Sequence, residues 1–138
     1  MKVAVLPNLD KRGSAEVVEK LGVILKNEGI EGYLPENIAG TDFKHLPEEQ
    51  LYKIADFIIT IGGDGTIIRY AKRAAFDDKP VLGINAGRMG YLANIEQNEL
   101  GLISKLKTGE YFIENRMMLS VSVVENGKKL AEYNALND

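Results

Sequence analysis

The feature that most constrains the fold is an apolar run that passes directly into a glycine-rich loop. Residues 56–61 contain Phe-Ile-Ile-Thr-Ile, which is typical of a buried strand, and residues 62–66 continue as Gly-Gly-Asp-Gly-Thr. Apolar residues then recur at helical spacing over residues 67–75, and residues 77–80 break this pattern before a second apolar run begins at Val81. A strand, helix, strand unit of this kind predicts neighbouring parallel strands in an α/β sheet.

The residues before this unit repeat the alternation. Residues 2–7 form an apolar run that ends at Pro7, as expected for a buried strand. An amphipathic helix should follow, with Ser14 as its N-cap and Gly29 as its C-terminal stop. Residues 30–50 contain Pro and Gly at several points, which predicts a short strand near Tyr33 followed by a loop.

The pattern changes in the last quarter of the chain. An amphipathic helix is expected to end at Gly109, and from Met117 apolar and polar residues alternate up to an Asn-Gly pair at Gly127. A second alternating run follows, which completes a β-hairpin signature. We therefore predict an α/β fold, with a Rossmann-like, mostly parallel sheet and flanking helices in residues 1–109. Residues 110–138 are expected to begin an incomplete, β-rich second domain.

Composition excludes several classes of protein. Of the 138 residues, 45% are hydrophobic and 27% charged, and charged residues interrupt every apolar run before the ~18 residues that a membrane span needs. The 17 basic and 20 acidic residues give a net charge of -3, without the basic excess of a nucleic-acid-binding protein. There is no Cys for a disulfide or a thiolate metal site. We expect no nucleic-acid or membrane partner and, with no secretory signal visible, a cytoplasmic location.

The glycines predict where a ligand binds. Six of the fourteen surround the ends of two consecutive predicted strands, at positions 62, 63, 65, 83, 87 and 90. Ligands of open α/β sheets bind at the carboxyl ends of strands, and a glycine loop that opens a helix lets backbone N–H groups approach a phosphate. A tight strand-to-helix turn without a ligand would also use glycine.

Asp64 needs a separate explanation, because phosphate oxygens would repel its carboxylate. It could bind a metal, cap the helix, or accept a proton from an attacking hydroxyl. Arg69 lies in the first turns of the same helix, where the dipole favours acids; either a bound anion or a solvated polar face would account for it. Tyr91, in the second loop, could contact a nucleotide or belong to the core. The loops contain neither the P-loop Lys nor, after the first strand, the GxGxxG pattern of nicotinamide cofactor sites.

Three ordered motifs resemble those of the NAD kinases. They are Gly-Gly-Asp-Gly-Thr at 62–66, Ile-Asn-Ala-Gly-Arg-Met-Gly-Tyr-Leu at 84–92, and Asn-Ala-Leu-Asn-Asp at 134–138. The first motif is shared with diacylglycerol kinases, sphingosine kinases and 6-phosphofructokinases. The second and third narrow the resemblance to NAD kinases.

The resemblance implies transfer of the γ-phosphoryl group of ATP, or of inorganic polyphosphate, to the 2′-hydroxyl of the adenosine ribose of NAD, which gives NADP. Asp64 would be the general base, and a divalent cation, Mg or Mn, would neutralise phosphate charge. The family positions that bind the substrates correspond to Gly63, Asp64, Gly65, Arg69, Tyr91, Asn137 and Asp138. In the last pair, Asp138 replaces the usual Glu and is shorter by one methylene.

The resemblance also bears on the extent of the chain. NAD kinases continue from the third motif into a β-rich C-terminal domain that completes the NAD pocket and the oligomer interface. The chain is thus expected to be the N-terminal portion of such an enzyme, inactive by itself and homo-oligomeric at full length. The alternatives are a lipid or sugar kinase of the same superfamily, or a non-catalytic nucleotide-binding module.

Overall fold

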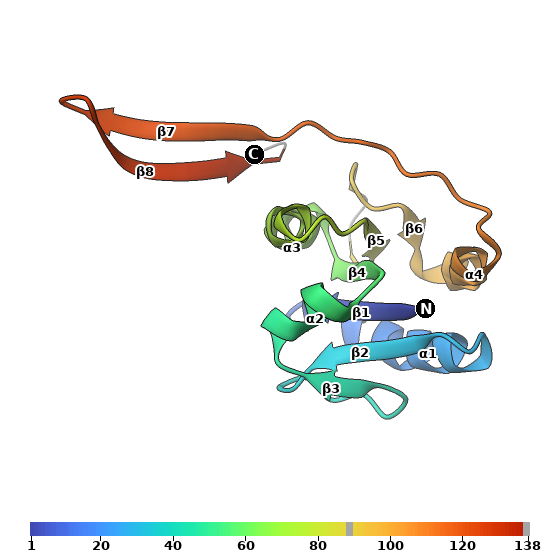
Figure 1. Ribbon diagram of the computed structural model, residues 1–138. Coiled ribbons are helices and arrows are strands. Elements are labelled where there is room, and N and C mark those ends of the chain that lie inside the picture. Colours follow the sequence, from blue (N-terminus) through green and yellow to red (C-terminus); the bar gives the residue numbers. More distant parts are fainter. Residues whose placement is uncertain (88–89, 137–138) are drawn as a thin grey trace.

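A parallel sheet forms the centre of the computed structural model, which describes residues 1–87 and 90–136. The sheet has six strands in the order β3-β2-β1-β4-β5-β6, and each neighbouring pair is parallel. The strands are β1 (Lys2–Pro7), β2 (Glu31–Pro35), β3 (Lys44–Leu46), β4 (Phe57–Gly62), β5 (Val81–Asn85) and β6 (Ile95–Glu96). The predicted parallel α/β sheet is therefore confirmed (Figure 1).

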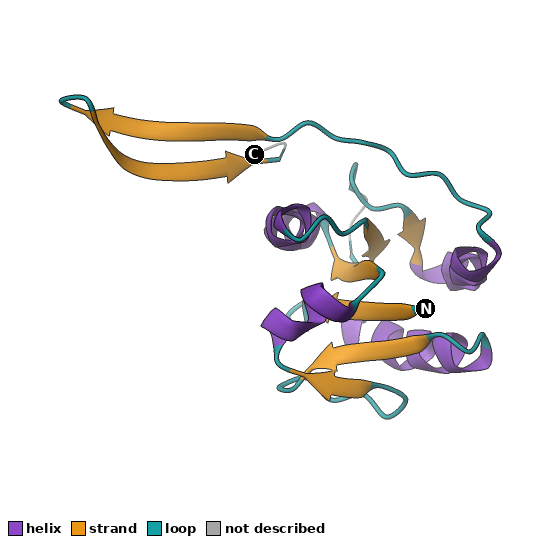
Figure 2. Cartoon of the chain, viewed as in Figure 1, coloured by secondary structure: helices purple, strands orange, loops and turns teal. Residues whose placement is uncertain are grey.

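Helices cover both faces of the sheet (Figure 2). They are α1 (Ser14–Asn27), α2 (Glu48–Ile54), α3 (Asp64–Phe76), the 3-10 helix η1 (Gln97–Ser104) and α4 (Lys105–Thr108). Helices α1, η1 and α4 pack in one hydrophobic cluster, and α2 and α3 in the other. All six residues of β4 are buried, with Ile58 in one cluster and Ile59 in the other. Burial on both faces explains why this strand is almost entirely apolar in the sequence, with Thr60 as its one polar side chain.

Two expectations for the first half of the chain were wrong. The segment expected to be loop contains β3 and α2, whose short spans lack a long periodic pattern; α2 buries only Leu51 and Tyr52. Ser14 is the first residue of α1 and not its N-cap, because Gly13 occupies the cap position with φ 88°. The Ser14 hydroxyl is buried and has no hydrogen-bond partner in the described part of the chain.

The predicted hairpin is present and forms a separate two-stranded sheet (Figure 1). Its strands are β7 (Leu119–Glu125) and β8 (Lys128–Ala135). Asn126 and Gly127 have φ values of 49° and 76°, the left-handed conformation that a two-residue hairpin turn requires. The apolar side chains of both strands are largely exposed, among them Val121 and Tyr133. The assignment of residues 110–138 to a second domain stays a prediction.

No helix in residues 1–87 and 90–136 is both long and apolar enough to cross a membrane.

Candidate functional site

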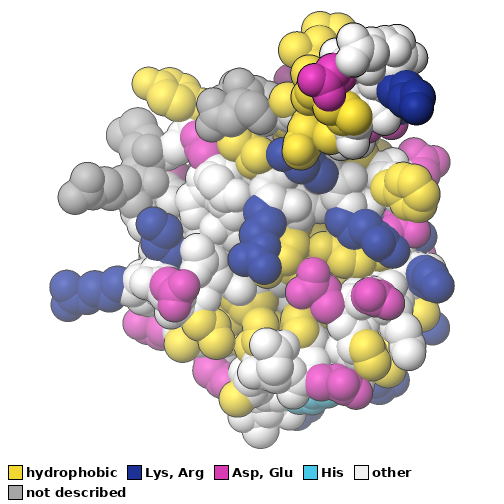
Figure 3. Space-filling view, turned by 90° about the vertical axis from the view of Figure 1, so that its left-hand side faces the viewer, with side chains coloured by type: hydrophobic (Ala, Val, Ile, Leu, Met, Phe, Trp, Pro, Cys, Tyr) yellow, Lys and Arg dark blue, Asp and Glu magenta, His cyan; other side chains and the backbone are white. Residues whose placement is uncertain are grey.

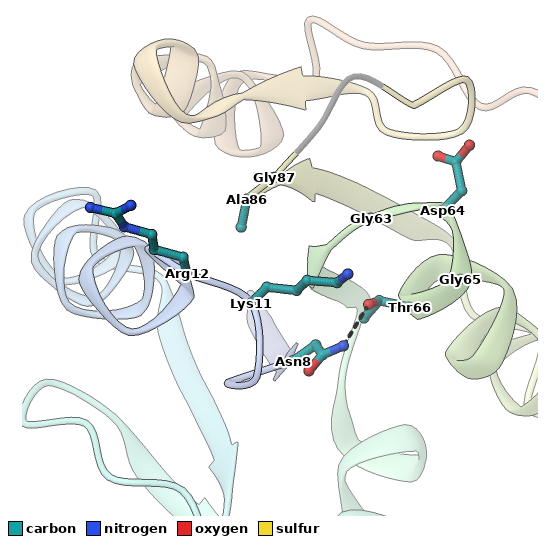
Figure 4. Close-up of a pocket in the computed structure, with 9 residues that line it drawn as sticks. All are labelled: Asn8, Lys11, Arg12, Gly63, Asp64, Gly65, Thr66, Ala86 and Gly87. Atoms are coloured by element: carbon teal, nitrogen blue, oxygen red, sulfur yellow. Dashed lines mark hydrogen bonds between the residues drawn. The ribbon is translucent and has the colours of Figure 1, made fainter.

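A cavity of about 710 Å³ lies where the order of the strands reverses. The chain builds β2 and β3 on one side of β1, then returns to place β4 on its other side, so the crevice between the loops after β1 and β4 is a topological switch point. The loop after β5 completes the cavity (Figure 4). The lining residues are Asn8, Lys11, Arg12, Gly63, Asp64, Gly65, Thr66, Ala86 and Gly87.

Backbone amides at the start of α3 are available to a ligand. Gly63 is the N-cap of α3 and, lacking a side chain, provides no capping group. The first N–H groups of a helix have no acceptor within the helix, and those of Asp64 and Gly65 find none elsewhere among the described residues. The positive end of the helix dipole lies at the same point. This turn is therefore suited to an anion.

Two glycines of the turn are explained neither by packing nor by backbone conformation. Neither Gly63 nor Gly65 has a positive φ, and a Cβ added to either would meet no described atom within 4 Å. By contrast, a Cβ on Gly62 would overlap Thr66, and one on Gly83 would overlap Ile67. Gly62 and Gly83 are thus required by packing. Gly63 and Gly65 leave open space beside the free amides, as close approach of a ligand to the backbone requires.

The carboxylate of Asp64 joins the two glycine-rich loops. Its Oδ2 accepts a hydrogen bond from the amide of Tyr91 at 2.9 Å, and its Oδ1 accepts one from the amide of Leu92 at 3.0 Å. Asp64 makes no helix-capping hydrogen bond, so the capping interpretation is wrong. Figure 4 shows its side chain pointing away from Lys11 and Asn8. The carboxylate therefore lies at the side of the cavity nearest the second loop.

Gly90 is adjacent to the carboxylate of Asp64, and we expect its substitution to destabilise the protein. A Cβ at position 90 would overlap the Asp64 carboxyl group, so Gly90→Ala should displace it and weaken both of its hydrogen bonds. We expect the free energy of unfolding in urea to fall by about 1–3 kcal/mol. Gly87→Ala is the matched control, because its Cβ would meet no described atom within 4 Å. Equal stability of the two variants would contradict the packing argument.

The second loop is shaped by two asparagines. The buried Asn85 donates from Nδ2 to both carboxylate oxygens of Glu96, at 3.1 and 3.0 Å, and its Oδ1 accepts the amide of Gly87 at 3.1 Å. Asn94 Oδ1 accepts the amide of Gly83 at 2.9 Å. The Asn85 side chain and the Asn94 Oδ1 therefore hold the loop in place.

The other predicted binding residues are placed differently. Tyr91 is 96% exposed, so it does not belong to the core. Its backbone amide donates to Asp64, and its ring is free to contact a ligand. Arg69 does not line the main cavity; it lines an adjoining cavity of about 330 Å³, and its guanidinium lies 5.3 Å from the centre of the Tyr70 ring. Asn137 and Asp138 lie outside the described residues.

Sequence reasoning missed the contribution of the loop after β1. Asn8, Lys11 and Arg12 line the cavity together with the glycine turn. This loop lacks a recognisable motif. It follows the carboxyl end of a predicted parallel strand, however, and that position was enough to predict that it could line a ligand site. The rule that ligands bind at this end of a sheet applies to it as much as to the two glycine-rich loops.

The described residues do not build a metal site of their own. In the ranges 1–87 and 90–136, no group of three or more His, Cys, Asp and Glu side chains is placed to hold a metal ion. Asp64, the one carboxylate among the described residues that line the cavity, already accepts two backbone hydrogen bonds.

Comparison with known proteins identifies the family of the chain. The family model described as the ATP-NAD kinase N-terminal domain matches residues 3–111. The chain belongs to this family. The NAD kinase of Natranaerobius thermophilus is 39% identical over 99% of the chain, and that of Caldanaerobacter subterraneus subsp. tengcongensis is 38% identical over 99%. These alignments cover 49% and 50% of the two relatives, so the chain spans about half the length of the NAD kinases it matches.

A solved structure shares the fold of this member of the ATP-NAD kinase family. Yeast NADH kinase, solved in complex with NADH, superposes with a TM-score of 0.74 over 98% of this chain and 46% of its own length. The sequence identity is 14%, so this likeness concerns the fold alone.

Proposed function

We propose that the protein is an NAD kinase, or the N-terminal half of one, which phosphorylates the 2′-hydroxyl of the adenosine ribose of NAD. The observation that carries the proposal is the turn at residues 62–66. It combines free backbone amides, two glycines open to a cavity and the carboxylate of Asp64 at one topological switch point. Membership of the ATP-NAD kinase family supports the assignment of the substrates.

In this proposal the amides at the start of α3 bind the phosphates of the donor. Amides and helix dipole supply partial positive charge at fixed positions, which stabilises the charge spread over a transferring phosphoryl group. The 2′-hydroxyl oxygen attacks the γ-phosphorus of ATP, a P–O bond forms, and the bond to ADP breaks. With polyphosphate as donor, the leaving group is the shortened polyphosphate.

Asp64 is proposed as the general base that accepts the proton of the 2′-hydroxyl. An ionised carboxylate has about four lone-pair positions on its two oxygens. The amides of Tyr91 and Leu92 occupy one on each oxygen, so acceptor capacity remains for a hydroxyl. The two amides also fix the orientation of the carboxylate, which a base needs to reach a bound substrate.

The remaining substrate contacts in the proposal follow the family motifs. The exposed ring of Tyr91 can stack on a base or pack on the ribose of the dinucleotide. Arg69, in the adjoining cavity, would pair with a phosphate of NAD, and Asn137 and Asp138 would also bind the dinucleotide. A divalent cation, Mg or Mn, would arrive bound to the donor's phosphates. Family membership further suggests a homo-oligomeric, cytoplasmic enzyme.

The test is a direct assay of the full-length protein with NAD and either ATP or polyphosphate. We expect NADP, detected with an NADP-specific dehydrogenase, and no phosphorylation of diacylglycerol or fructose 6-phosphate. Phosphorylation of either alternative acceptor in preference to NAD would support a lipid or sugar kinase. Binding of NAD and ATP without NADP formation would support a non-catalytic module.

A further inference from the structure

The wall of the cavity opposite the glycine turn carries two cations, Lys11 and Arg12, on the loop between β1 and α1. Hydrogen bonds within this loop fix the position of Lys11. Its amide donates to the carbonyl of Asn8 at 3.1 Å, and its carbonyl accepts the amide of Ser14 at 3.1 Å. The Asn8 side chain, in turn, accepts the amide of Asp10 at 3.1 Å. The backbone of Lys11, from which its side chain extends, is therefore held at the edge of the cavity.

The charge of Lys11 and Arg12 is not neutralised within the described part of the chain. Neither side chain forms an ion pair with a carboxylate in residues 1–87 and 90–136. Figure 4 shows the Lys11 ammonium extending toward the turn that opens α3, while the Asp64 carboxylate points away from it. In Figure 3, which looks onto the side toward which β1 runs, Lys and Arg side chains gather over the middle of the face.

A buried hydroxyl in the same cavity provides a second, independent indication of a ligand. Thr66 is 6% exposed and lines the cavity. Its Oγ1 accepts a hydrogen bond from Asn8 Nδ2 at 3.5 Å, but the hydroxyl proton has no acceptor among the described residues. Buried hydroxyl groups normally satisfy their donors, so an acceptor supplied by a ligand would complete this site.

We propose that Lys11 binds the oligophosphate chain of the phosphoryl donor. Arg12, whose guanidinium points away from the glycine turn in Figure 4, assists by adding positive charge at the wall of the cavity. The identification of the ligand as a donor rests on the proposed function. The free amides of Asp64 and Gly65 lie on one side of the cavity and Lys11 on the other, so successive phosphates are bound between them. A volume of about 710 Å³ accommodates a chain of phosphates. Thr66 donates its proton to one of the phosphate oxygens.

Calorimetric titration of the full-length protein with inorganic tripolyphosphate, without a metal, tests this inference. We expect Lys11→Met to raise the Kd for tripolyphosphate about tenfold or more, since a charge-assisted contact is lost. Lys11→Arg should restore most of the affinity, and Arg12→Met should have a smaller effect than Lys11→Met. The control is Lys72→Met, which removes an exposed cation of α3 that does not line the cavity. The Kd for NAD should not change in any of these variants.

The outcomes distinguish this inference from the proposed function. Tripolyphosphate affinity equal to wild type in Lys11→Met and in the Lys11→Met/Arg12→Met double variant would overturn it, as would the absence of binding to wild type. A loss of affinity for NAD alone would also overturn it, because the cations would then bind the dinucleotide. Parallel titrations with ATP should show the same loss if the phosphates are what is recognised. A wild-type protein that binds tripolyphosphate through Lys11 but makes no NADP would support this site and contradict the proposed function.

Discussion

Replacing Asp64 with Asn in the full-length protein should lower the rate of NAD phosphorylation by about 10²- to 10⁴-fold, the usual contribution of a general base. The amide of Asn cannot accept the proton of the 2′-hydroxyl. We expect the Kd for NAD to change much less than kcat, because binding also depends on groups away from the carboxylate. Steady-state kinetics with NADP detection, combined with titration of NAD, measures both quantities.

The structure adds a second effect of the same variant, which must be measured separately. Asp64 accepts the amides of Tyr91 and Leu92 on its two oxygens, whereas Asn has one acceptor oxygen and an NH₂ group that would face the other amide. The free energy of unfolding should therefore fall by about 1–3 kcal/mol. Gly90→Ala is the control, because it disturbs the same hydrogen bonds and retains the carboxylate. If Asp64→Asn remains folded and phosphorylates NAD at the wild-type rate, Asp64 is not the base.

Gly65→Ala should have opposite effects on stability and on ligand binding. Gly65 lies in the first turn of α3 with no positive φ and no described atom within 4 Å of an added Cβ. Alanine is a better helix former than glycine by up to about 1 kcal/mol, so the free energy of unfolding should rise or stay the same. The new methyl group would occupy the space beside the free amides, and the Kd for ATP should rise by about tenfold or more.

The control for this substitution is Gly101→Ala in η1, which also adds a Cβ in open space and does not line the cavity. It should leave the Kd for ATP unchanged. Gly63→Ala tests the neighbouring position, where an added Cβ is equally unobstructed, and should weaken ATP binding in the same way. Unchanged ATP affinity in both Gly63→Ala and Gly65→Ala would show that no ligand approaches this turn closely.

Much of the fold could be predicted because it depends on patterns among residues that are close together in the sequence. The apolar run of β4 reflects a strand buried on both faces, and the left-handed Asn126 and Gly127 form the turn that their sequence predicts. The segments β3 and α2 could not be predicted in this way. They are short, and α2 is stabilised by the packing of Leu51 and Tyr52 against the sheet, which no local pattern reveals.

The sequence alone therefore determined the parallel α/β class, the two glycine-rich loops and the position of Asp64 at the end of a buried strand. Only the tertiary structure decided the order of the strands, which places Lys11 across the cavity from the glycine turn. It also decided that Asp64 is bound by Tyr91 and Leu92, which lie 27 and 28 residues further along the chain. The physical reason is that periodicity records which face of each segment is buried, whereas strand order depends on which distant segments pack together.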